Sequence, residues 1–173
     1  DTYTFNTNYI FEAVADTSGA DTFDFTDFGQ ALDITLSSGQ WLDLGQSHDW
    51  GTLNYADGRT IDFTAFDSRD LYIPDNVVIE NVTGTNLADT LVGNAFSNVL
   101  SGGAGDDSLQ GGAGGDTING GDGIDTAKFS GSYADYTVNA SGGTVTVIDT
   151  RTASPDGTDT LTGIETLYFA GDN

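Results

Sequence analysis

The sequence contains no cysteine and no methionine, and only 4 of its 173 residues are Lys or Arg. Without cysteine, disulfide bonds and thiolate metal sites are excluded. The 27 Asp and Glu residues bring the formal net charge to −23, which disfavours nucleic acids and anionic membranes as partners, because both are polyanions. No run of about 18 apolar residues is present, so no segment is predicted to span a membrane. The absence of Met at position 1 predicts a processed product or an excised piece of a longer protein.

The acidic residues are almost all Asp, with Glu only at positions 12, 80 and 165, and the chain also has 24 Gly. This composition is poor for helices and favours turns and oxygen-ligand sites. A chain of such charge could be disordered throughout. Its 2 Trp, 7 Tyr and 10 Phe, together with alternating runs of β-branched residues, instead indicate a folded protein when cations are present.

A repeat of nine residues is the strongest feature of the sequence. Its units begin at five evenly spaced glycines: Gly84, Gly93, Gly102, Gly111 and Gly120. The sixth place of each unit is polar: Asp89, Asn98, Asp107, Asp116 and Asp125. The eighth place is apolar: Leu91, Leu100, Leu109, Ile118 and Ala127. A flexible Gly/Asp-rich linker would have no reason to keep an apolar eighth place, so the pattern predicts a folded repeat.

The spacing has a direct physical interpretation. Glycines at the first, second and fourth places allow a tight turn, and places seven to nine form a short strand whose middle side chain points inward. Successive turns then alternate between two sides of a flattened coil with two units per coil. Carboxylates of stacked turns would repel one another unless a cation lay between them. Carboxylate and carbonyl oxygens favour Ca²⁺. The nonapeptide resembles the calcium-binding parallel β-helix repeat of RTX proteins.

Stacked turns are two units apart, which pairs 84–89 with 102–107, 93–98 with 111–116, and 102–107 with 120–125. We expect about three calcium ions between these pairs, held by second- and fourth-place carbonyls of the lower turn, first- and third-place carbonyls of the upper turn, and both sixth-place side chains. The second pair should be the weakest site, because it contains the neutral Asn98. The predicted ligands are Thr85, Leu87, Asp89, Asn94, Phe96, Asn98, Gly102, Gly103, Ala104, Gly105, Asp107, Gly111, Ala113, Asp116, Gly120, Asp122 and Asp125.

The sequence predicts an all-β fold: a single elongated, sandwich-like domain in which a right-handed parallel β-roll at 84–128 is flanked by antiparallel strands. The N-terminal region, 1–83, has alternating patterns at 21–28 and 32–36, an inserted loop or hairpin at 46–72, and a strand at 77–82. The C-terminal region, 129–173, should form an antiparallel cap with a hairpin turning at Ser141-Gly142-Gly143 and a closing strand at 160–169.

The repeats, together with two flanking motifs, resemble the C-terminal RTX β-roll domain of serralysin-type secreted metalloproteases over residues 1–128. The stretch from Asp16 to Phe25 is similar to the family's D-x-G-G-x-D-T-F-D-F, with Ser18 in place of Gly. Val78-Ile79-Glu80-Asn81 is similar to its T-I-E-N entry to the roll. The resemblance implies one or two further calcium ions, one bound by Asp16, Ser18, Gly19 and Asp21 partly with Thr2, and one by Val78 and Glu80. The tail at 157–165 resembles endings of RTX proteins that carry other catalytic domains.

Catalysis and glycan binding are two alternatives to this interpretation. The chain has no H-E-x-x-H motif, and His48 is its only histidine, more typical of a surface loop than of a catalytic set with Asp49. Asp106 and Asp107 could imitate a pair of glycosidase carboxylates, but within a calcium turn they should be ionised and occupied. Sugars could stack on Trp41, Trp50, Tyr55 and Tyr72, although such rings also serve as end caps of a β-domain.

We therefore expect a secreted, monomeric and non-catalytic calcium-binding module. By the resemblance, it would pass through a type I secretion machinery, fold on Ca²⁺ outside the cell, and stabilise an upstream catalytic domain such as a metalloprotease. The alternative is a carbohydrate-binding module attached to a polysaccharide-modifying enzyme or an adhesin. A self-associating adhesin unit is a third possibility.

Overall fold

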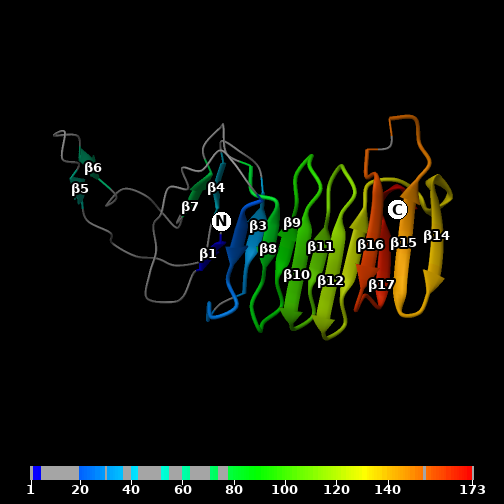
Figure 1. Cartoon of the computed structure of the whole chain (residues 1–173), viewed down its shortest axis with the longest axis horizontal. Helices are drawn as coiled ribbons and strands as arrows, with labels where there is room; N and C mark the ends of the chain where they lie inside the picture. Colours follow the sequence, from blue (N-terminus) through cyan, green and yellow to red (C-terminus); the bar gives the residue numbers. More distant parts are fainter. Residues whose placement is uncertain are drawn as a thin grey trace.

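The computed structural model describes residues 2–4, 20–29, 31–36, 40–42, 52–54, 60–62, 71–73, 78–153 and 155–172. Within them the fold is built from short strands that stack along one axis (Figure 1). The only helical segments among these residues are two 3₁₀ turns, Tyr133–Asp135 and Ala170–Asp172. The all-β prediction is confirmed. No helix in the described part of the chain is long and apolar enough to cross a membrane.

The repeats form the central part of two facing sheets. Three strands of the larger sheet pair in parallel: β8 (Asn81–Thr83), β10 (Val99–Ala104) and β12 (Thr117–Asp122). Three strands of the smaller sheet do the same: β9 (Thr90–Val92), β11 (Ser108–Gln110) and β13 (Thr126–Phe129). The chain alternates between the sheets at each unit, so two units make one coil. The predicted parallel β-roll is confirmed.

The eighth-place residues fill the space between the sheets. Leu100 is in register with Ile118 in one sheet, and Leu109 is in register with Ala127 in the other. All five eighth-place side chains are fully buried, as the spacing predicts. Because each repeat unit contributes a single eighth-place side chain to this stack, every unit depends on its neighbours for burial.

The roll extends beyond the repeats at both ends. Four flanking strands pair in parallel with it: β2 (Thr22–Asp24) with β8, β3 (Asp33–Thr35) with β9, β16 (Thr158–Thr162) with β12, and β17 (Thr166–Phe169) with β13. A further parallel strand, β1 (Thr2–Thr4), lies beside β2. The prediction of antiparallel flanks is wrong for these strands, because each flank makes one more coil in the same sense. The closing strand predicted at 160–169 is two strands, one in each sheet.

A true antiparallel hairpin interrupts the last coil. It consists of β14 (Tyr136–Ser141) and β15 (Thr144–Asp149), and β15 also pairs antiparallel with β16. Gly142 and Gly143 form the turn with φ values of 61° and 84°, a conformation that glycine adopts without strain. The hairpin predicted around this Gly-Gly pair is confirmed, and its strands form the edge of the larger sheet.

Two small antiparallel pairs lie in the N-terminal region. One joins β4 (Gln40–Leu42) to β7 (Leu71–Ile73) and places Trp41 in register with Tyr72. The other joins β5 (Thr52–Asn54) to β6 (Thr60–Asp62), inside the insertion predicted at 46–72. Trp50, Tyr55 and His48 lie outside the described residues.

Aromatic side chains close the core at both ends. At the N-terminal end, Phe25 makes edge contacts with Phe23 and Phe28, at ring-centroid distances of 6.1 and 5.9 Å. At the C-terminal end, Phe129 and Tyr136 pack on Phe169 at 5.4 and 5.1 Å. These rings cover the last layers of the aliphatic stack and exclude water from it.

Candidate metal centre

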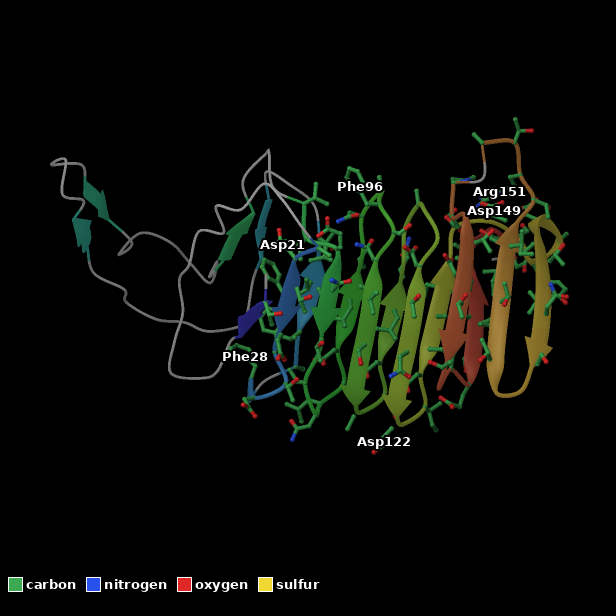
Figure 2. All side chains as sticks on the ribbon, in the orientation of Figure 1. Asp21, Phe28, Phe96, Asp122, Asp149 and Arg151 are labelled. Atoms are coloured by element: carbon green, nitrogen blue, oxygen red, sulfur yellow. The ribbon has the colours of Figure 1, made fainter. Side chains whose placement is uncertain are left out.

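The turns between the sheets stack into two columns on opposite edges of the roll. We call 84–89, 102–107 and 120–125 the first column, and 93–98 and 111–116 the second. Asp122 and Phe96 mark the two edges (Figure 2). In the first column the Ala104 N–H donates to the Thr85 carbonyl at 3.1 Å, and in the second the Ala113 N–H donates to the Asn94 carbonyl at 3.0 Å. The structure thus brings together the three pairs of turns inferred from the spacing.

Sixth-place carboxylates form a ladder along each column. The Asp89 N–H donates to Asp107 Oδ1, and the Asp107 N–H donates to Asp125 Oδ1, both at 2.8 Å. In the second column the Asn98 N–H donates to Asp116 Oδ1 at 2.8 Å. These hydrogen bonds set the side chains of successive turns one above another.

Each of the three upper turns leaves one carboxylate oxygen without a partner. Asp107 Oδ2, Asp116 Oδ2 and Asp125 Oδ2 are buried and accept no hydrogen bond. By contrast, Asp89 Oδ2 accepts from the Thr85 backbone N–H at 2.7 Å. A buried charged oxygen without a partner carries a large desolvation cost, which a cation would remove. The three oxygens belong one each to the three pairs of turns, and they fit calcium ligation.

Glycine makes room for oxygen atoms between stacked turns. Gly103 and Gly121 have φ values of 109° and 111°, a conformation that disfavours any side chain. A Cβ atom at Gly103 would collide with the Thr85 carbonyl, and one at Gly121 would collide with the Gly103 carbonyl. Backbone carbonyls therefore lie close to the next turn. The described residues contain no group of three or more His, Cys, Asp or Glu side chains suited to a metal, so an ion here would need these carbonyls as ligands.

Burial dominates the titration of the ladder. It raises the pKa of Asp107 to about 6, and the charges of Asp89 and Asp125 add to the effect. Burial likewise raises the pKa of Asp89, Asp116 and Asp125. A buried carboxylate is costly as a free anion and is stabilised by a bound cation.

Amide groups take a different role at the N-terminal end of the second column. Asn98 Nδ2 donates to the Glu80 carbonyl at 2.9 Å, and Asn94 Nδ2 donates to the Ile79 carbonyl at 2.7 Å. The Glu80 side chain accepts the Asp21 N–H at 2.8 Å, so the two sets of flanking candidates meet here. The neutral side-chain amides of Asn94 and Asn98 thus donate to the backbone carbonyls of Ile79 and Glu80, in the part of the N-terminal flank where calcium ligands were predicted. Asp16, Ser18 and Gly19 lie outside the described residues.

Sequence reasoning missed one carboxylate at the C-terminal end of each column. The Asp116 N–H donates to Asp159 Oδ1 at 2.9 Å, and the Asp125 N–H donates to Glu165 Oε2 at 2.8 Å. Burial and then the charge of Asp116 raise the pKa of Asp159 to about 8. A signal was present, because an acid, Thr and an apolar residue follow one another at 159–161 and 165–167, as they do at 116–118.

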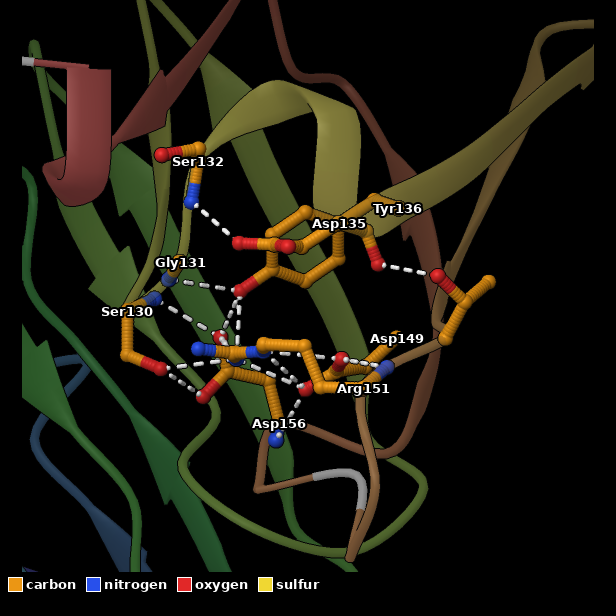
Figure 3. A network of polar contacts seen from close by, with 9 residues as sticks. Ser130, Gly131, Ser132, Asp135, Tyr136, Asp149, Arg151 and Asp156 are labelled. Atoms are coloured by element: carbon orange, nitrogen blue, oxygen red, sulfur yellow. Dashed lines mark hydrogen bonds and ion pairs between the residues drawn. The ribbon is translucent and has the colours of Figure 1, made fainter.

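Sequence reasoning also missed a buried ion network beneath the hairpin (Figure 3). The Arg151 guanidinium lies 2.7 Å from Asp149 Oδ2 and 3.2 Å from Asp156 Oδ2, and donates to the Tyr136 hydroxyl at 2.7 Å. Its hydrogen bonds lower the pKa of Asp149 to about 2. Asp156 also accepts from the backbone N–H and hydroxyl of Ser130, at 2.7 Å each. The positive charge of the Arg151 side chain thus balances two buried carboxylates, Asp149 and Asp156, where the hairpin joins the roll.

Comparison with known proteins identifies the central segment. Residues 83–118 and 92–127 match the RTX calcium-binding nonapeptide repeat (4 copies). No curated protein matches the chain. Residues 83–127 are therefore RTX repeats, a type that binds Ca²⁺, and the RTX prediction is confirmed. The serralysin resemblance, the individual ligands and the number of ions stay predictions.

Proposed function

We propose that the chain is a non-catalytic calcium-binding module of a secreted bacterial protein. It folds on Ca²⁺ after type I export and stabilises a catalytic domain upstream. The observation that carries this proposal is the set of three buried, unpartnered carboxylate oxygens, one in each pair of stacked repeat turns. They give the folded state a specific need for cations that the unfolded chain does not have.

The size of the calcium effect suits a folding switch. Extracellular modules bind Ca²⁺ with dissociation constants of about 10⁻⁴–10⁻³ M, far above cytosolic concentrations. Each site held at ten times its dissociation constant adds about 1.4 kcal/mol, so three sites add about 4 kcal/mol. That is a large fraction of the roughly 5–15 kcal/mol that stabilises a typical domain. A net charge of −23 further destabilises the metal-free compact state.

Circular dichroism of the whole chain tests the switch. We expect the spectrum of an unfolded chain in excess chelator and a β-sheet spectrum once Ca²⁺ reaches the millimolar range. Mg²⁺ at the same concentration should have little effect, because it requires near-ideal octahedral geometry and retains its water. A β-sheet spectrum that chelator leaves unchanged would contradict the proposal.

A further inference from the structure

Residues 155–159 form one more turn of the second column, although they lie outside the matched repeats. The Thr158 N–H donates to the Gly114 carbonyl at 3.1 Å, and the Thr160 N–H donates to the Asp116 carbonyl at 2.8 Å. The Asp116 N–H donates to Asp159 Oδ1. The turn at 111–116 contacts 93–98 in the same way through two of these bonds: the Thr117 N–H donates to the Asn98 carbonyl, and the Asn98 N–H donates to Asp116 Oδ1.

This additional turn creates a buried pair of acids. Asp116 and Asp159 are each only 2% exposed. The Asp116 N–H donates to Asp159 Oδ1 at 2.9 Å, as the N–H groups of Asp89, Asn98 and Asp107 do to the acid of the next turn, and Asp116 Oδ2 is buried and accepts no hydrogen bond. Burying two carboxylates on stacked turns carries a desolvation and repulsion cost that a cation would remove.

The described basic side chains do not supply that cation. The Arg151 guanidinium is engaged in ion pairs with Asp149 and Asp156. Lys128 is on β13, in the other sheet. The groups on these two turns that could bind a metal are carboxylate and carbonyl oxygens, which prefer a hard ion such as Ca²⁺ to a transition metal.

We propose that the turns at 111–116 and 155–159 hold a calcium ion with Asp116 and Asp159 as its side-chain ligands. This inference rests on the proposed function, because it assumes that stacked turns of this chain take calcium. The ion ties β16 to β12 across a separation of 43 residues, and thus secures the coil that the hairpin interrupts.

Counting bound ions in the Asp159→Asn variant tests this site. Asn keeps an acceptor for the Asp116 N–H but removes the charge and directs an amide toward the site, as Asn98 does toward Glu80. The control is Asp33→Asn, which removes the same charge from an exposed position on β3. Native mass spectrometry of the whole chain over a range of Ca²⁺ concentrations should find that Asp159→Asn needs more Ca²⁺ than the control to bind its last ion. The same calcium dependence in both variants would overturn the site alone, whereas a wild-type chain without calcium would overturn the proposed function as well.

A second measurement does not depend on how the variant folds. In a crystal structure of the wild-type chain grown with Ca²⁺, we expect an ion about 2.3–2.6 Å from both the Asp116 and Asp159 carboxylates. If ions fill the repeat turns and no ion lies between these two residues, the inference is wrong.

Discussion

Replacing Asp107, Asp116 and Asp125 together by Asn should leave the chain unfolded at millimolar Ca²⁺. Each substitution replaces one of the buried carboxylate oxygens that accept no hydrogen bond. The variant loses the roughly 4 kcal/mol that three sites supply at ten times their dissociation constant. Circular dichroism during a calcium titration measures the effect.

The matched control replaces the exposed residues Asp27, Asp33 and Asp172 by Asn. It changes the net charge equally, and so it reports the relief of charge repulsion by itself. We expect the control to fold at a calcium midpoint close to that of the wild type. If both triple variants fold at the same calcium concentration, the ladder carboxylates do not bind the ions.

Shortening one of the eighth-place side chains in the core should also lower the stability of the fold strongly. Leu109 is fully buried on the central strand of the smaller sheet. Leu109→Ala should lower the free energy of unfolding in saturating Ca²⁺ by about 2–5 kcal/mol, because it leaves a cavity that neighbouring coils cannot fill. Urea unfolding measures the loss.

Val99→Ala provides the comparison for this core position. Val99 is 48% exposed on the adjoining sheet, and surface substitutions usually change stability by no more than about 0.5 kcal/mol. Similar unfolding midpoints for the two variants would show that the eighth-place stack is not the core of the roll.

The sequence was sufficient to predict the repeat, its core and the pairing of its turns. The reason is that a nine-residue period places each glycine, acid and apolar residue at a fixed point of a regular coil. The same period also explains why Leu100 and Ile118 meet, since they are two units apart.

The ends of the roll were harder to predict, because there the period is broken by insertions. Asp159 and Glu165 continue the ladders, but about 40 residues separate them from their neighbours Asp116 and Asp125. Only the recurring acid-Thr-apolar triplet marks these two residues. The alternation of apolar and polar residues in the flanks does not distinguish parallel from antiparallel strands, and so it led to the wrong prediction of antiparallel flanks. The Arg151 network could not be predicted, because its partners come together only when the hairpin folds over the last coil.

Isothermal titration of the calcium-free chain with Ca²⁺ measures the binding itself. We expect saturable binding of three or more ions per chain, one for each unpartnered carboxylate of the repeats, with dissociation constants of about 10⁻⁴–10⁻³ M. An absence of binding heat up to several millimolar Ca²⁺, with no accompanying change in structure, would contradict it.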